Sequence, residues 1–229
     1  MNFIAVNSIP RIARIIFFVA VTLCATTSIA ASNQANSLDF DKVFNDKAEP
    51  AQVQFQASYQ LGADKHEVQV WRDRNQRLKR RTDDALETFI FKQPREVEWS
   101  MVVLDLKRKI RTDIDRTNLY RIGHFTDWFS MSHALSRPTA AYQLTTASKP
   151  LPEEKAIDSC NWYSLTRNGA ESKVCWSKKY RLPLLITDSE ARVQWRVTSV
   201  SSKAIAASNF DIQDQHFVRN NANEDIHAD

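Results

Sequence analysis

The sequence predicts a mainly β chain of the α+β class, built on an antiparallel sheet with a few short helices. In the segment 53–61, apolar residues alternate with glutamine and serine, which is the pattern of a strand that buries one face. Turn residues then recur about every ten positions, a spacing typical of an antiparallel meander rather than of parallel β-α-β units. Apolar residues make up 43% of the chain, enough for the core of a folded domain.

The predicted elements follow in order. A short helix begins after Ser37, its expected N-cap, and ends at Pro50. Gly62 turns the chain from the first strand into a second, at 66–72. More strands are expected at 86–91, 97–103, 106–114, 160–165, 173–180, 182–186 and 193–197.

The segment 117–136 interrupts the strand pattern. Its apolar residues fall near one helical face, and Pro138 closes it. Phe125, Trp128 and Phe129 make it unusually aromatic. Two roles fit such a segment: a helix that fills the core of the sheet, or a lid over an apolar cavity.

Two cysteines, Cys160 and Cys175, flank a hairpin signal at 167–169 and are expected to form a disulfide. They lie directly opposite each other only if the hairpin has a four-residue loop, 166–169. A two-residue loop would place Cys160 opposite residue 177. In the first register, Tyr163 and Trp176 share the face that points into a core or cavity, and the disulfide lies on the other face.

The N-terminal segment has the pattern of a bacterial secretory signal. Two arginines precede an unbroken apolar run at 15–23, and small residues follow, with cleavage expected after Ala30 or Ala31. An uncleaved anchor is the alternative. We therefore expect a periplasmic protein with a signal peptide over 1–30, a polar leader and short helix over 31–50, one β domain over 51–217 and a flexible polar tail over 218–229.

Composition argues against several enzyme classes. The chain of 229 residues has only 3 glycines, so it contains no phosphate-binding glycine loop, no dinucleotide-binding fingerprint and no serine-hydrolase elbow. None of the 5 histidines has the spacing of a metal pair, and they are expected to be solvated or to cap helices. We expect no catalytic residue, no metal and no cofactor.

Basic residues gather after the second predicted strand, although the net charge of the chain is only +4. They form the solvent-exposed faces of neighbouring strands, or a patch for anionic lipid head groups or an acidic protein. An exported protein is not expected to bind nucleic acid, and the segment lacks interleaved aromatic residues. The residues of this basic patch are Arg72, Arg74, Arg77, Lys79, Arg80 and Arg81.

The order of these patterns resembles the periplasmic outer-membrane lipoprotein carrier and receptor (Lol-type) superfamily. The resemblance lies in the strand pair from 53 to 81 and in Cys-Trp at 175–176, Tyr-Arg-Leu-Pro-Leu at 180–184, Trp-Arg-Val at 195–197 and Phe-Asp-Ile at 210–212. It implies a curved antiparallel half-barrel with helices packed on its concave face and an apolar cavity that binds acyl chains. The disulfide hairpin and the aromatic segment depart from the carrier pattern, so the chain resembles a divergent member.

The resemblance favours a soluble periplasmic binding protein that shelters a lipid or lipoprotein acyl chain and is not integral to the membrane once processed. A protein-interaction or sensor module of the cell envelope, with no ligand turnover, is the alternative, and an enzyme acting on envelope lipid or glycan comes third. The expected cavity residues are Phe55, Tyr59, Trp99, Met101, Phe125, Trp128, Phe129, Tyr163 and Trp176.

Overall fold

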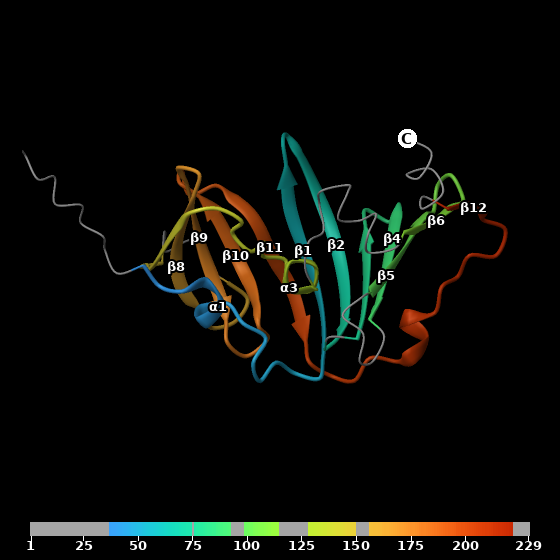
Figure 1. Ribbon diagram of the computed structural model, residues 1–229, viewed down its shortest axis with the longest axis horizontal. Helices are drawn as coiled ribbons and strands as arrows, with labels where there is room; N and C mark the ends of the chain where they lie inside the picture. The colour runs from blue at the N-terminus through green and yellow to red at the C-terminus, as the bar shows by residue number, and fades with distance from the viewer. Residues whose placement is uncertain (1–36, 75, 93–98, 115–127, 150–155, 222–229) are drawn as a thin grey trace, which may run out of the picture. The chain divides into compact units, whose positions relative to one another are not determined.

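The described residues form one curved, open sheet of 12 strands (Figure 1). The expected signal peptide, the leader up to residue 36 and Phe125 lie outside the residues that the structure describes. All described residues belong to one unit, Ala35–Asp229. This computed structural model describes residues 37–74, 76–92, 99–114, 128–149 and 156–221.

The strands lie in the order β12-β6-β5-β4-β3-β2-β1-β11-β10-β9-β8-β7, so β12 and β7 are the two edges. Neighbouring strands are antiparallel except β12 and β6, which are parallel. The predicted mainly β, antiparallel class is therefore confirmed. The strands are β1 (Gln52–Leu61), β2 (Asp64–Asp73), β3 (Arg77–Thr82), β4 (Leu86–Lys92), β5 (Trp99–Asp105), β6 (Ile110–Ile114), β7 (Tyr142–Thr146), β8 (Asn161–Arg167), β9 (Ala170–Ser177), β10 (Leu182–Asp188), β11 (Val193–Ser201) and β12 (Val218–Asn221).

Two meanders, β1 to β6 and β7 to β11, are joined where β1 pairs with β11. The alternation predicted in β1 is present: Val53, Phe55 and Ala57 are buried on one face. We call this the helix face, because the short helices α1 (Phe40–Val43) and α3 (Trp128–His133) pack against it. That this face is the concave one, as the resemblance implies, stays a prediction.

The chain between β11 and β12 packs on the opposite face of the sheet, over part of the first meander. A 3-10 helix, η1 (Ala207–Phe210), places Phe210 against Trp71 of β2. Further along, Ile212 and Phe217 pack beside Phe89 of β4. This segment therefore shields the apolar residues of β2 and β4 that point away from the helices.

The first helix is shorter than predicted and begins later. Asp39 is its N-cap, because the Asp39 carboxylate accepts a hydrogen bond from the Lys42 backbone N–H. Ser37, the predicted N-cap, instead accepts a hydrogen bond from the Leu144 N–H through its hydroxyl, 3.1 Å away. The predicted cap was wrong because Ser37 pairs with a distant strand edge, which its local sequence does not reveal.

The interior strand β3 and the two edge strands were not predicted as separate strands. Strand β7 has five residues, and β12 has four residues in a region expected to be a flexible tail. The first four residues of that tail are thus ordered, by parallel pairing of Val218 with Ile110 and of Asn220 with Thr112. An edge strand buries little apolar surface, so its own sequence carries a weak signal.

The disulfide hairpin has a different register from the one predicted. Arg167 pairs with Ala170, so the loop is the two-residue one, with Asn168 and Gly169 at φ 49° and 78°. The disulfide still forms, because Cys160 lies just outside β8 and reaches diagonally to Cys175, with a Cα–Cα distance of 5.3 Å. The predicted faces are unaffected, since a shift of two residues preserves the alternation.

Candidate ligand-binding groove

A groove of about 490 Å³ opens on the helix face. Apolar side chains line it where β1 to β5 pair: Phe55 lies opposite Val70, and Ile90 lies between Leu78 and Met101. Met131 and Ala134, in and just after α3, line it from the helix side, and Trp195 lines it from β11. The groove is therefore a mainly apolar channel built between the sheet and one short helix.

The structure brings three of the predicted cavity residues together in this groove: Phe55, Tyr59 and Met101. Trp99 packs in the same core cluster but is only 5% exposed and does not line the groove, and Trp128 is partly buried against that cluster. The prediction missed Val70, Leu78 and Trp195, although their alternation in β2, β3 and β11 was available as a signal.

The predicted residues Phe129, Tyr163 and Trp176 lie in a second, filled region of the helix face. Tyr163 and Trp176 contact Phe44, whose ring centre lies 5.4 Å and 5.2 Å from theirs in edge-to-face geometry. Phe129 of α3 and Phe40 of α1 complete the same cluster. Since Phe44 and Trp176 are both 0% exposed, this half of the face holds an aromatic core.

Polar groups of the groove gather around Arg80 of β3, which lies between Leu78 and Thr82 in the lining. The Arg80 Nη2 donates to the Tyr59 hydroxyl at 3.2 Å, and the Arg80 Nε donates to the Thr82 hydroxyl at 3.3 Å. In the sheet Arg80 pairs with Val70 and Thr88, one row beyond the wholly apolar pair of Leu78 and Ile90. Along β3 the lining therefore changes from apolar Leu78 to polar Arg80 and Thr82, although Val68 and Leu86 flank Thr82 on the neighbouring strands.

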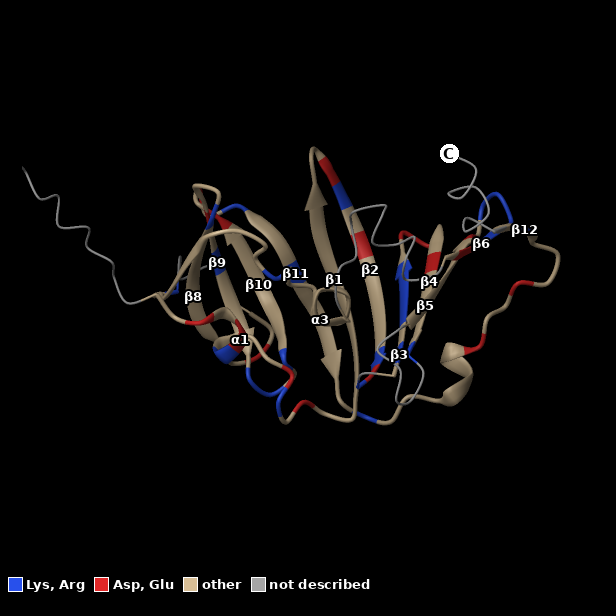
Figure 2. Cartoon of the chain, in the orientation of Figure 1, with Lys and Arg blue, Asp and Glu red and all other residues tan. Residues whose placement is uncertain are grey.

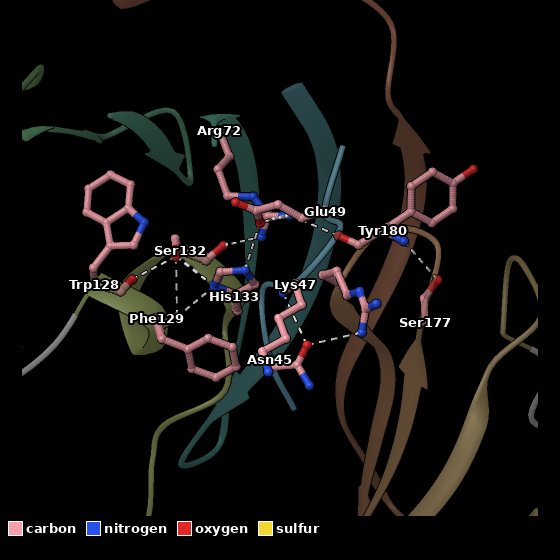
Figure 3. A network of polar contacts seen from close by, with 11 residues as sticks. Asn45, Lys47, Glu49, Arg72, Trp128, Phe129, Ser132, His133, Ser177 and Tyr180 are labelled. Atoms are coloured by element: carbon pink, nitrogen blue, oxygen red, sulfur yellow. Dashed lines mark hydrogen bonds and ion pairs between the residues drawn. The ribbon is translucent and has the colours of Figure 1, made fainter. Parts of the chain in front are cut away.

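A buried polar network fastens α3 to the sheet beside the groove (Figure 3). Arg72 of β2 is fully buried and donates to the backbone carbonyls of Ser132 and Tyr180, both at 2.9 Å. Its Nη2 also lies 3.2 Å from the carboxylate of Glu49. Burial lowers the pKa of Arg72, and the charge of Glu49 opposes that shift. The buried guanidinium is thus paired and hydrogen-bonded, as its burial requires.

His133 joins the same network, where a solvated or capping histidine was expected. Its Nε2 lies 3.0 Å from the Glu49 carboxylate, and its Nδ1 lies 2.7 Å from the Ser132 hydroxyl (Figure 3). Burial lowers the pKa of His133, while the hydrogen bond to Glu49 raises it in part. His133 Nδ1 also lies 3.1 Å from the Phe129 backbone carbonyl, so both ring nitrogens have partners in the buried network.

This serine, histidine and glutamate have the composition of a hydrolase triad but not its access. Ser132 is 1% exposed and His133 is 0% exposed, so no substrate reaches the hydroxyl in this conformation. The Ser132 hydroxyl also lies 2.7 Å from the Trp128 carbonyl, within its own helix. The three residues hold α3 in place next to the groove.

The expected basic patch is not a single surface. Strand alternation puts Arg72 and Arg80 on the helix face and Arg77, Lys79 and Arg81 on the opposite face. Arg72 is buried rather than exposed, which contradicts its place in a surface patch. In Figure 2 the basic segment of β3 lies between strands that carry acidic segments. Ion pairs follow from this arrangement: Arg77 with Asp73, Lys79 with Glu87 and Arg81 with Asp84.

Two further features are absent from the described residues. No three His, Cys, Asp or Glu side chains in this part of the chain come close enough together to hold a metal ion. No helix among the same residues has the length and apolar character needed to cross a membrane.

The chain has distant similarity to solved structures. No protein family model and no curated protein matches it. It is similar to the crystal structure of MucB in complex with MucA(peri), with 13% identity, a TM-score of 0.35 and coverage of 70% of this chain and 54% of that one. It is also similar to the structure of PNGF-II, with 11% identity, a TM-score of 0.37 and coverage of 77% and 32%. The chain spans about half of the MucB chain and a third of the PNGF-II chain, and likeness this distant carries no argument about function.

Proposed function

We propose that this protein binds an apolar chain, such as a lipid or lipoprotein acyl chain, in the groove on the helix face. The observation that carries the proposal is a groove of about 490 Å³ lined mainly by Phe55, Val70, Leu78, Ile90 and Met101. Its volume lies in the range of ligand pockets, about 300–1,000 Å³. An acyl chain gains about 0.8 kcal/mol for each CH₂ group that it buries, so such a site needs no covalent chemistry.

The proposal is one of binding without turnover. A short helix held over the sheet by Arg72, Glu49 and His133 lines a fixed groove, which suits the shelter of a ligand. The Cys160–Cys175 disulfide fits an oxidising compartment such as the periplasm. An envelope protein as a second partner stays a prediction, because the basic residues expected to recruit it are divided between two faces.

The first test is mass spectrometry of organic extracts and of the intact protein, purified under gentle conditions from a bacterial periplasm. A disulfide-containing periplasmic protein of similar size serves as the control for adventitious lipid. We expect about one equivalent of an acyl-chain lipid on this protein and none on the control. A protein free of lipid that also fails to bind the neutral fluorescent probe N-phenyl-1-naphthylamine would overturn the proposal.

A substitution that fills the groove locates the site. Thr88 lines the middle of the groove on β4, so Thr88→Trp introduces an indole where the chain would lie. We expect about a tenfold or greater loss of probe affinity, because the indole occupies space in which the probe would bury its apolar rings. Thr198→Trp makes the same change at an exposed position of β11 outside the groove and should bind as the unaltered chain does. Equal binding by both variants would place the ligand elsewhere.

A further inference from the structure

Arg80 is the only Lys, Arg, Asp or Glu among the described residues that line the groove. It lies in the centre of the groove on β3, where its alternation directs it onto the helix face with Leu78 and Thr82. A cation in an apolar channel loses hydration and therefore needs a partner. The groups that compensate the charge of Arg80 therefore determine which ligands the groove can bind.

The described residues supply Arg80 with neutral partners only. Its Nε and Nη2 donate to the hydroxyls of Thr82 and Tyr59, and its guanidinium carbon lies 5.5 Å from the centre of the Tyr59 ring. No carboxylate of the described residues lies within ion-pair distance of it, and its Nη1 has no acceptor there. By contrast, Arg72, Arg77, Lys79 and Arg81 on the same two strands each pair with an acidic side chain.

The acidic side chains nearest to Arg80 in the sheet bind other protein groups. Asp105 shares the face, since it pairs with Leu86, but its carboxylate accepts from the backbone N–H groups of Lys107 and Arg108. Asp83 binds the His66 ring and the Glu67 backbone N–H. Neither of these carboxylates therefore neutralises Arg80, and its charge is available to pair with a ligand.

The hydroxyls around Arg80 are also suited to an oxyanion. Each accepts a hydrogen bond from the guanidinium, so the proton of each hydroxyl is available to a further acceptor. Neither hydroxyl donates to a protein group within the described part of the chain. Arg80 Nη1, Tyr59 and Thr82 thus offer three donors inside the groove, and a carboxylate or phosphate accepts such a set through charge-assisted hydrogen bonds.

We infer that the ligand of this groove is a single-chain amphiphile with an oxyanion head, whose carboxylate or phosphate binds Arg80, Tyr59 and Thr82 while its chain lies along Leu78, Ile90 and Met101. This inference rests on the proposed function and assigns the charge and the orientation of the ligand. The order of the groove supports it: polar donors lie one sheet row away from the apolar lining.

The test compares three ligands that share one chain: hexadecanoate, hexadecyl phosphate and hexadecanol. Each displaces N-phenyl-1-naphthylamine from the full-length protein after removal of co-purified lipid, below the concentration at which the ligand forms micelles. The variants are Arg80→Met, which keeps an apolar stem of similar length, and Arg80→Lys, which keeps the charge. Arg192→Met removes a cation that is 66% exposed and outside the groove, and serves as the matched control.

We expect the unaltered protein to bind at least one anionic ligand about tenfold to a hundredfold more tightly than hexadecanol, as charged hydrogen bonds allow. Arg80→Met should lose this preference yet still bind hexadecanol, Arg80→Lys should keep part of it, and Arg192→Met should keep all of it. The better of the two anionic ligands identifies the head group as carboxylate or phosphate.

Two results would overturn the inference while leaving the proposed function intact: equal binding of all three ligands by the unaltered protein, or an undiminished preference in Arg80→Met. Failure of the unaltered protein to bind any of the three would overturn the proposed function as well. Thermal unfolding of each variant shows whether it has folded, and Arg80→Lys remains as a test if Arg80→Met does not fold.

Discussion

The two halves of the helix face are lined by similar apolar residues, but one half is filled and the other contains the groove. One half, the packed half, is defined by Phe44, Tyr163 and Trp176. Aromatic rings there fill the space between α1 and the second meander. In the groove half, defined by Phe55, Leu78 and Met101, the sheet faces α3 across a space of about 490 Å³. Both halves are rich in apolar side chains, so the difference lies in whether a helix places rings in the space above the strands.

α3 connects the two halves. Phe129 belongs to the packed half, whereas Met131 lines the groove. Arg72 and His133 hold the same helix to β2 and to Glu49. A helix fixed at this point keeps the groove open beside a closed core, so the comparison predicts a different response to substitution in each half.

The largest effect is expected in the packed half. Phe44→Ala should lower the free energy of unfolding by about 3–5 kcal/mol, because it leaves a cavity among fully buried rings. Urea unfolding followed by tryptophan fluorescence measures it. Leu61→Ala is the control, since Leu61 is 65% exposed and its truncation should cost little. A loss below about 1 kcal/mol for Phe44→Ala would mean that this half is no better packed than the groove half.

An intermediate effect is expected at the junction of the halves. His133 has a lowered pKa because of its burial, so the unfolded chain binds its proton more readily than the folded chain does. Its contribution to stability is therefore complete above the ordinary histidine pKa of about 6.5 and is lost as the pH falls below it, by at most about 1.4 kcal/mol per pH unit. Urea midpoints measured between pH 8 and pH 5 should fall on acidification.

His133→Gln isolates this contribution, because an amide can still donate to Glu49 but does not titrate. Its urea midpoint should fall less steeply with pH than that of the unaltered protein. His216→Gln, at an exposed position, should keep the original slope. Identical slopes for the His133 variant and the unaltered protein would show that the pH dependence arises at another group.

The smallest effect is expected in the groove half. Leu86 lines the groove but is 42% exposed, so Leu86→Ala should change the free energy of unfolding of the ligand-free protein by about 0.5 kcal/mol or less. The same urea series measures it, with Phe44→Ala as its counterpart. A loss of 2 kcal/mol or more would show that the groove half is packed as tightly as the other half. The proposed difference in packing between the two halves would then be wrong.

Local sequence patterns determined much of the sheet. The alternation in β1 assigned Phe55 and Tyr59 to one face, and the pattern at Asn168 and Gly169 marked a hairpin. Alternation depends only on adjacent residues, so it can be read before any strand is paired. The burial of Tyr163 and Trp176 followed from it, even though the predicted register of their hairpin was wrong.

The tertiary structure alone decided which part of the face is filled. Phe44 occupies the space over Tyr163 and Trp176 because α1 lies over the second meander, a contact across more than a hundred residues that no local pattern encodes. The tertiary structure alone also decided the partners of Arg72 and Arg80. The two arginines belong to the same predicted basic patch, and their local sequence does not distinguish them.

The sequence by itself thus determined the class of fold and the faces of β1 and of the β8–β9 hairpin. The pairing of distant segments decided that Arg72 is buried against Glu49 and that Arg80, within the described part of the chain, contacts neutral groups only. The physical reason is one of range. Side-chain alternation is set by the backbone of a single strand, whereas burial and charge compensation depend on elements brought together only when the whole sheet has formed.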